Sequence, residues 1–187
     1  MKKRKSERTR DKIIDMFYQL NQEPGKPIST VPEICDAIEI SVSTFYCHFS
    51  GIGDLIDHES AKLKEFWDRH IDNYLRYAET STPATIFTHD LVAAIVHGFI
   101  DRKKQHLVLL RSDLNLPFRR YMYNIVFKAT TVHLKYYPNV QREYAAIFMT
   151  EGGFATAISF LARDDMNVDA FTDLLFNIGN AVVCATN

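Results

Sequence analysis

The sequence has few of the residues that hold small domains together covalently or through a metal. Its 187 residues include three cysteines, Cys35, Cys47 and Cys184, which form neither a disulfide framework nor a paired metal-binding spacing. No two of the seven histidines stand four residues apart, and no H-E-x-x-H pattern occurs. We therefore expect no metal, no cofactor and a reducing, cytoplasmic environment.

The sequence also lacks a long apolar run. A membrane-spanning helix needs about 18 uninterrupted apolar residues, and the basic N-terminus is not followed by the apolar segment of a signal peptide. The apolar fraction of 47% is nevertheless enough for a substantial core. These features predict a protein without a membrane partner.

Catalytic signatures are missing as well. The chain contains no G-x-S-x-G motif, no glycine-rich phosphate loop and no Cys-His signature. Its carboxylates are dispersed along helical segments, as they are on solvent-facing surfaces. The sequence therefore predicts a protein that is not an enzyme.

Charge is nearly balanced in total but unevenly placed. The formal net charge of −1 does not by itself indicate a nucleic-acid binder. Residues 1–10, however, carry six lysines and arginines against one glutamate, a net of +5, whereas residues 11–50 carry a net of −4. Two interpretations of this basic arm are open: a solvated tail, or a source of contacts to DNA phosphates.

Apolar residues recur with the helical period along most of the chain, and no segment shows sustained strand alternation. The sequence therefore predicts an all-α fold. The expected helices cover about residues 7–21, 54–79, 84–104, 105–111, 118–136, 140–163 and 168–185.

Residues 30–49 carry the most informative pattern. Thr30 and Glu33 form a capping box that begins one short helix, and Ser41 is a natural N-cap for a second. Phe45 and Phe49, four residues apart, are expected to bury one face of the second helix. The other faces then carry Val42, Ser43, Thr44, Tyr46, Cys47 and His48. Two short helices joined in this way form a helix-turn-helix, whose second helix enters the DNA major groove.

This stretch resembles the N-terminal domain of the tetracycline-repressor (TetR/AcrR-type) transcriptional regulators. Their pattern T-V-x-x-I-A…G-V-S-x-x-T-x-Y-x-H-F is matched by Thr30, Val31, Ile34, Ala37, Ile40, Ser41, Thr44, Tyr46, His48 and Phe49. Residues 9–20 resemble the first helix of the family. The resemblance implies an N-terminal three-helix DNA-binding domain over residues 1–53. It also implies a C-terminal helical bundle for effector binding and dimerisation over residues 54–187.

The resemblance implies a function as well. It predicts a homodimeric DNA-binding transcriptional regulator, a repressor that a small-molecule effector releases from a palindromic operator. Serine and threonine hydroxyls can bond to phosphates or base acceptors, and Val42 can touch a thymine methyl. The residues implied in DNA binding are Thr30, Ser41, Val42, Ser43, Thr44, Tyr46 and His48, with Lys5 and Arg8 of the basic arm.

The sequence departs from the family at positions that matter for DNA affinity. Glu39 replaces the turn glycine, although a non-glycine residue adopts a left-handed conformation only at a cost. Val42, Cys47 and Ile52 occupy positions where the family often has a basic residue. An alternative function follows: a helical module that binds a small molecule or a protein partner and has a weakened DNA-reading head.

A run of small residues marks the penultimate helix. Gly152 and Gly153 lie in mid-helix, where each glycine costs about 1 kcal/mol relative to alanine. A kink, a tight contact within the chain or a partner helix would each compensate. Because the family dimerises through its last two helices, the resemblance implies a dimer interface. Its expected residues are Gly152, Gly153, Ala155, Thr156, Ser159, Leu175, Ile178 and Val182.

The central region is rich in aromatic residues and methionine, as are both ordinary cores and pockets between bundle helices. The family usually binds a small effector in this region, and some of its members respond to a protein partner instead. The ligand-binding residues implied by the resemblance are Trp67, Tyr74, Phe99, Tyr121, Met122 and Phe148.

Overall fold

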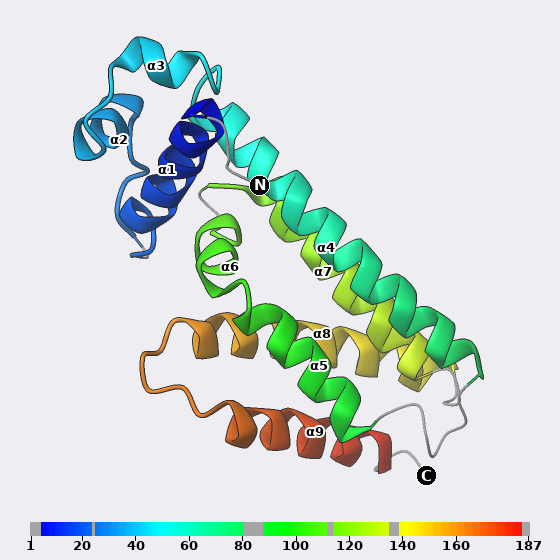
Figure 1. Ribbon diagram of the computed structural model, residues 1–187. Coiled ribbons are helices and arrows are strands. Elements are labelled where there is room, and N and C mark those ends of the chain that lie inside the picture. Colours follow the sequence, from blue (N-terminus) through cyan, green and yellow to red (C-terminus); the bar gives the residue numbers. More distant parts are fainter. Residues whose placement is uncertain (1–4, 24, 81–87, 112–113, 135–138, 185–187) are drawn as a thin grey trace. The chain divides into compact units, whose positions relative to one another are not determined.

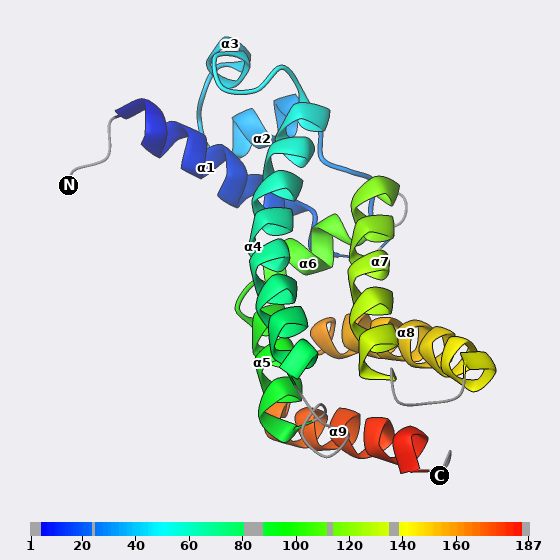
Figure 2. The ribbon, with the colours of Figure 1, turned by 90° about the vertical axis from the view of Figure 1, so that its right-hand side faces the viewer.

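The computed structural model describes residues 5–23, 25–80, 88–111, 114–134 and 139–184. Within these ranges the secondary structure is helical and no strand occurs, so the all-α prediction is confirmed (Figures 1 and 2). The helices are α1 (Lys5–Leu20), α2 (Val31–Ala37), α3 (Val42–Tyr46), α4 (Ile52–Thr80), α5 (His89–Ile100), α6 (Lys103–Leu109), α7 (Leu116–His133), α8 (Asn139–Leu161) and α9 (Val168–Cys184).

The largest difference from the predicted helices lies after α5. The sequence predicted one helix over residues 84–104, but α5 ends at Ile100 and α6 begins at Lys103. Asp101 closes α5 by donating its backbone N–H to a carbonyl one turn earlier, 2.8 Å away. Helical periodicity continues through this break, so the pattern could not reveal it. Residues 84–87 lie outside the described part of the chain.

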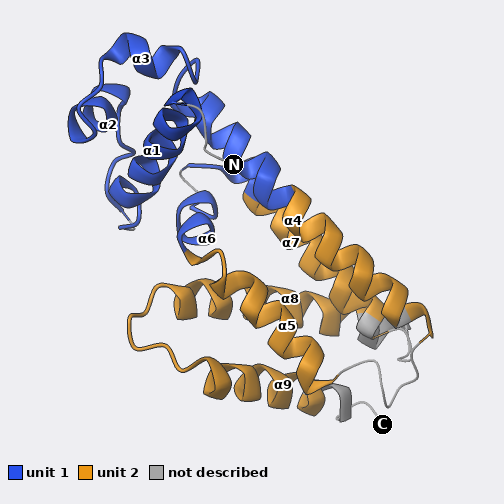
Figure 3. Ribbon diagram, in the orientation of Figure 1, with its two compact units in different colours: residues 1–64, 104–118 blue, residues 65–103, 119–187 orange. Residues whose placement is uncertain are grey.

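The chain divides into two compact units (Figure 3). Unit 1 comprises residues 1–64 and 104–118, and unit 2 comprises residues 65–103 and 119–187. Helix α4 contributes its first part to unit 1 and the remainder to unit 2. The domain boundary after residue 53 stays a prediction.

The core of unit 1 is built from apolar side chains at helical spacing. Ile13 and Phe17 of α1 and Ile34 of α2 are fully buried. Phe45 of α3 and Phe49, just after it, are buried as well, with ring centroids 6.0 Å apart. The prediction that these two phenylalanines bury one face of the second motif helix is therefore confirmed.

A buried polar bridge fixes the loop between α1 and α2. The Asn21 side chain donates to the Phe17 carbonyl at 2.6 Å and to Ser29 Oγ at 2.7 Å. It also accepts the Ser29 backbone N–H at 3.0 Å. Because the buried amide has these partners, its desolvation is compensated and the loop is held in one conformation.

Hydrogen bonds from Arg111 and Asn115 tie residues 104–118 to the rest of unit 1. Arg111 is buried and donates to the Lys26 carbonyl at 2.6 Å and to the Asn21 carbonyl at 3.4 Å. Asn115 donates its amide to Ser60 Oγ at 2.6 Å. These bonds join a segment from the middle of the chain to the loop after α1 and to the first part of α4.

A buried carboxylate joins α1 to the first part of α4. Glu59 is only 6% exposed. Its Oε2 accepts the Tyr18 hydroxyl at 3.0 Å and its Oε1 accepts Lys62 Nζ at 2.8 Å. Burial, and then the Glu59 charge, raise the pKa of the Tyr18 hydroxyl, so the group remains a donor at neutral pH.

Unit 2 packs the remainder of α4 with α5, α7, α8 and α9. The Trp67 ring of α4 lies 4.7 Å from the Phe99 ring of α5. Gly98 permits this approach, since a Cβ there would come within 3.2 Å of the Trp67 ring. Phe160 and Phe171 stack with centroids 3.7 Å apart and join α8 to α9.

Tyr18→Phe removes the donor to Glu59 and keeps the ring. We expect the free energy of unfolding to fall by roughly 1–3 kcal/mol, the cost of leaving a buried acceptor unsatisfied. Urea denaturation at neutral pH measures the change.

A second background is the control for this prediction. In a Glu59→Gln background the same substitution is expected to cost less, and an equal cost in both backgrounds would contradict the bond between Tyr18 and Glu59.

The stability that Tyr18 contributes depends on pH. The folded state raises the pKa of Tyr18, so this contribution to stability is fully present below the ordinary tyrosine value of about 10 and is lost as the pH rises above it. Tyr18→Phe is therefore expected to reduce the alkaline loss of stability.

Candidate functional site

Local hydrogen bonds position α2 and α3. The Thr30 backbone N–H donates to Glu33 Oε2 at 2.7 Å, and the Glu33 N–H donates to Thr30 Oγ1 at 3.4 Å, which confirms the predicted capping box. Ser41 Oγ accepts the Thr44 N–H at 3.1 Å, so Ser41 is the N-cap of α3 as predicted. The hydrogen bond from the Thr30 backbone lowers the pKa of Glu33, which keeps the cap ionised at neutral pH.

The side chains assigned to the outer faces of the second helix are accessible. Val42 is 42% exposed and Tyr46 is 55% exposed, whereas Phe45 between them is buried. Ser41, Ser43 and Cys47 are also exposed, and Thr44 and His48 are half-buried. The structure therefore brings the predicted residues to one accessible region, and their contact with DNA stays a prediction.

Hydroxyl groups gather at the start of α3. Ser41 Oγ lies 2.8 Å from Ser43 Oγ and 2.8 Å from Thr44 Oγ1. The Thr30 hydroxyl is also engaged, since it donates to Glu33 Oε2 at 2.8 Å. Thr30 and Ser41 thus serve first as caps, while each hydroxyl oxygen retains capacity for a further hydrogen bond.

The turn between α2 and α3 is formed without glycine. Glu39 has a φ of 55°, the left-handed conformation that favours glycine. The next residue, Ile40, donates its N–H to the Cys35 carbonyl at 3.0 Å. The expected cost at Glu39 is therefore present in the backbone, and the turn keeps its hydrogen bonding.

Part of the basic arm, from Lys5 onward, forms the first turns of α1. Lys5 and Arg8 are exposed on this helix, and residues 1–4 lie outside the described range. Arg10, which the charge count included in the arm, lies against the core instead. Its guanidinium is 5.0 Å from the Phe49 ring centroid, and Nη2 is 3.1 Å from His58 Nε2. Burial, then the charges of Lys62 and Arg10, lower the pKa of His58.

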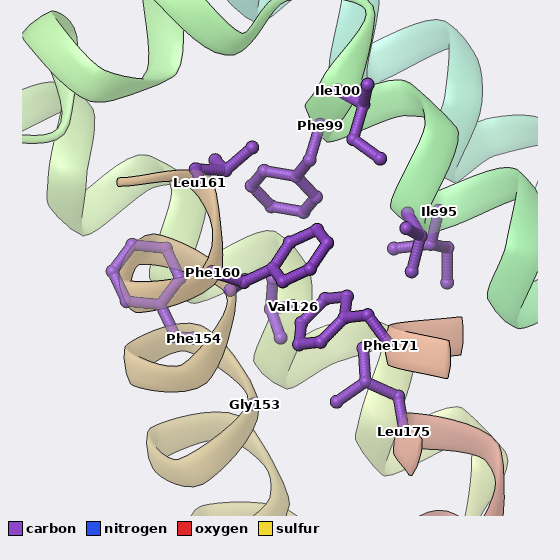
Figure 4. A pocket seen from close by; sticks show the side chains of 12 residues that line it. Ile95, Phe99, Ile100, Val126, Gly153, Phe154, Phe160, Leu161, Phe171 and Leu175 are labelled. Carbon is purple, nitrogen blue, oxygen red and sulfur yellow. The ribbon is translucent and has the colours of Figure 1, made fainter. Parts of the chain in front are cut away.

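Unit 2 contains two apolar cavities. Cavity A has a volume of about 120 Å³ and is lined by Ile95, Val96, Phe99, Ile100, Val126, Gly153, Phe154, Ala157, Phe160, Leu161, Phe171 and Leu175 (Figure 4). Cavity B has a volume of about 130 Å³ and is lined by Trp67, Ile71, Tyr74, Leu91, Ile95, Phe99, Met122, Ile125, Val126, Ala129, Thr130 and Met149. Three residues line both: Ile95, Phe99 and Val126.

The structure brings four of the six expected ligand-binding residues together. Trp67, Tyr74, Phe99 and Met122 line cavity B. Tyr121 lines neither cavity A nor cavity B and donates its hydroxyl to Asp68 at 2.6 Å, and Phe148 is 66% exposed. That the six residues bind a ligand stays a prediction, and helical spacing alone does not say which face of a helix meets a neighbour.

Sequence reasoning missed most of cavity A. Its lining comes from α5, α7, α8 and α9, and pairs such as Ile95 with Phe99 or Phe171 with Leu175 stand four residues apart. That spacing indicates a shared helix face. It does not distinguish a cavity wall from a filled core.

The residues expected at a dimer interface differ in their surroundings. A Cβ on Gly152 or Gly153 would meet no atom within 4 Å, so no tight contact within the described chain explains these glycines. Ala155, Thr156 and Ser159 line an open groove of about 600 Å³. Ile178 is 46% exposed, whereas Gly153 and Leu175 line cavity A. The Val182 side chain lies outside the described part.

Helix α8 has an unusual combination of composition and exposure. Over Glu143–Leu161 it is long and apolar enough, by length and composition, to cross a membrane. Only 28% of its most apolar 18-residue stretch is buried, however. Sequence reasoning found no uninterrupted apolar run because this stretch mixes apolar with small and polar residues. Exposed apolar patches of this kind mark protein–protein or membrane interaction sites.

Potential metal ligands do not converge in the described residues. No group of three or more histidine, cysteine, aspartate or glutamate side chains could hold an ion there.

Solved structures with the same helical arrangement are transcriptional regulators. A regulator described as TerR/AcrR family, from Aquifex aeolicus VF5, matches with a TM-score of 0.66 and 14% identity over 93% of this chain and 99% of its own. A TetR-family regulator from Bordetella parapertussis 12822 matches at 0.61 and 17%, over 92% and 94%. The fatty acid degradation regulator FadR from Bacillus halodurans matches at 0.61 and 17%, over 96% of each chain. No protein-family model and no curated sequence matches.

This chain has the TetR/AcrR-type fold. The resemblance first found in residues 30–49 is thus confirmed over nearly the whole chain at the level of the fold. In a TetR/AcrR-type fold the α2–α3 pair described above is the helix-turn-helix.

Glu39→Gly is expected to stabilise the protein. The left-handed conformation costs a non-glycine residue about 1–2 kcal/mol, and the greater entropy of unfolded glycine offsets about 0.5–1 kcal/mol of the gain. We expect a net increase of about 0.5–1 kcal/mol in the free energy of unfolding, measured by urea denaturation. Asp36→Gly, in the adjacent helix α2, is the matched control and is expected to destabilise. A loss of stability in Glu39→Gly would show that the turn conformation is not as described.

Proposed function

We propose that this chain is a homodimeric DNA-binding transcriptional regulator, a repressor that a small-molecule effector releases from a palindromic operator in the cytoplasm. The surface of α3 is the observation that carries the proposal. This capped helix buries Phe45 on one side and presents small and hydroxyl-bearing groups on the other. The fold it shares with three transcriptional regulators supports the same function.

In this proposal the first residues of α3 read the DNA. Val42 is placed against a thymine methyl, and the hydroxyls of Ser43 and Thr44 bond to base edges or phosphates. Tyr46 and His48 contact the sugar-phosphate backbone and fix the orientation of the helix. The exposure of Val42 and Tyr46 supports this assignment.

In the described residues, the proposed interface contains few cations. Helix α3 carries no lysine or arginine, and the position of Ile52 is apolar. Lys5 and Arg8 at the start of α1 are the exposed basic side chains proposed to contact phosphates. The affinity of a protein for DNA falls as the salt concentration rises, and the fall is steeper when more phosphates are neutralised. We therefore expect the nonspecific DNA affinity of this chain to be low and to depend only weakly on salt concentration.

Exposed apolar and small residues on α8 and α9 support dimerisation. Tyr144 and Ile147 of α8 are 70% and 41% exposed, and Leu174 and Ile178 of α9 are 49% and 46% exposed. Gly152 has open space around its Cβ position, which leaves room for a partner helix to approach. A second copy of this chain would bury these groups and supply the two-fold symmetry that a palindromic site needs.

Cavity B is the proposed effector site. Helix α4 links the two units covalently, because its first part belongs to unit 1 and its later part carries Trp67 and Tyr74 into the lining of cavity B. An effector that binds one arrangement of α4 better than another shifts the equilibrium between them. Two recognition helices must span about 34–36 Å or a multiple of it, so a small displacement weakens simultaneous binding to both half-sites.

One specific observation favours a second candidate function. The shortage of cations around α3 also fits a helical module that binds a small molecule or a protein partner and has a weakened DNA-reading head. DNA binding that is nonspecific at all fragments would favour this alternative.

The combined variant Thr44→Ala, Tyr46→Ala is expected to lose specific DNA binding. Removing one or two base or backbone contacts costs about 1–3 kcal/mol each, so we expect affinity for the selected operator to fall at least tenfold. Gel shifts against genomic fragments at a stated salt concentration measure the affinity. Thr80→Ala, Tyr77→Ala, at the far end of α4, is the matched control and is expected to bind like the unmodified protein. Equal operator affinity in both double variants would overturn the proposed interface.

The variant Gly152→Ala tests whether Gly152 lies against a partner helix or against its own chain. Because the added Cβ meets no atom of the described part of its own chain within 4 Å, the subunit is expected to gain up to about 1 kcal/mol in stability. The dimer is expected to weaken, since a methyl would meet the approaching helix. Sedimentation equilibrium measures the dissociation constant of the dimer, and Gly53→Ala, also open to solvent, is the control. An unchanged dissociation constant would exclude Gly152 from the interface.

A further inference from the structure

Cavity A differs chemically from an ordinary polar binding site. None of the side chains that line it is polar or charged. Its wall includes the stacked rings of Phe160 and Phe171, whose planes are 3° apart, and the ring of Phe99 faces the same space (Figure 4). A cavity of this kind offers water no hydrogen-bond partner, so it binds small apolar molecules in preference to water.

The volume restricts the size of an occupant. Cavity A measures about 120 Å³, and an apolar cavity of about 150 Å³ is sufficient for benzene. Cavity A is slightly smaller than that, so its occupant is limited to about one aromatic ring or a short hydrocarbon. A charged group does not, because its desolvation would have no compensating partner in the lining.

Cavity A and the proposed dimer surface share their walls. On α8, Gly153 and Ala157 line the cavity, while Gly152 and Ala155 beside them are exposed. On α9, Leu175 lines the cavity next to the exposed Leu174. A molecule that fills the cavity contacts both helices from inside, and so acts on the surface that a second subunit would meet.

We propose that cavity A binds a small, uncharged apolar molecule and that its occupancy changes the affinity of two subunits for each other. The coupling rests on the dimer of the proposed function, whereas the ligand class rests on the lining alone. A ligand shifts an equilibrium only by its difference in affinity for the two states. The lining residues on α8 and α9 supply that difference, because subunit pairing fixes the spacing of the same helices.

Coupling of this kind is reciprocal. If the ligand changes the dimer dissociation constant by some factor, then dimerisation changes the ligand affinity by the corresponding factor. Binding must therefore depend on protein concentration across the range in which the dimer forms. Cavity B shares Phe99 with cavity A, and the only tryptophan of the chain, Trp67, packs on Phe99. Trp67 lines cavity B, so its fluorescence responds to occupancy of cavity B directly and to occupancy of cavity A through Phe99. Substitution of Ala157, which lines cavity A alone, distinguishes the two sites.

The ligand class is tested with three probes of similar size: toluene, benzoate and benzylammonium. We expect toluene to bind and both charged probes to bind at least tenfold more weakly, measured by calorimetry and by Trp67 fluorescence. Ala157→Leu fills the cavity and is expected to abolish toluene binding. Gly153→Ala adds a single methyl without a clash and is expected to weaken it. Ala94→Leu, exposed on α5, is the control of equal size and is expected to bind toluene normally.

The coupling is tested by sedimentation equilibrium of the full chain with and without saturating toluene. We expect the dimer dissociation constant to change at least threefold, and to be insensitive to toluene in Ala157→Leu. Absent toluene binding, or equal binding of benzoate, would overturn the ligand class. A dimer with an unchanged dissociation constant would overturn the coupling alone. A chain that stays monomeric throughout would overturn the coupling and the proposed dimer together, while the probe series would still decide the ligand class.

Discussion

The burial of Phe45 and Phe49 is the constraint on which the candidate DNA-reading surface depends. Helix α3 has only five residues, far fewer than an isolated helix needs to be stable in water. It persists because both phenylalanines are buried in unit 1 and Ser41 caps its first turn. Two buried rings thus determine which side of α3 faces outward, and Val42 and Tyr46 are exposed as a consequence.

Two arginines of unit 1 make contacts inside the unit. Arg10 lies over Phe49 and beside His58, and Arg111 holds the loop after α1 through backbone carbonyls. Both contacts support the core that orients α3. Under the proposed function, these two arginines are therefore not available for contacts to DNA phosphates.

In unit 2, helices α8 and α9 each have inner residues that line a cavity and outer residues that are exposed. Their inner residues, such as Ala157 and Leu175, line a cavity without polar groups, and their outer residues include Gly152 and Ile178, which are exposed. Small side chains on α8 make both features possible, because they leave space inside and permit close approach outside.

The sequence by itself determined what depends on neighbours within about one helical turn: the all-α class, the Thr30–Glu33 capping box, the Ser41 N-cap and the buried pair Phe45 and Phe49. Only the tertiary structure decided which faces meet. It turned Arg10 inward, joined residues 104–118 to unit 1 through Arg111, and placed Gly153 and Leu175 in a cavity wall. The physical reason is the range of the interactions. Caps and helical spacing act over three or four residues, whereas the Arg111 bonds cross 85 and 90 positions, and no local pattern specifies such partners.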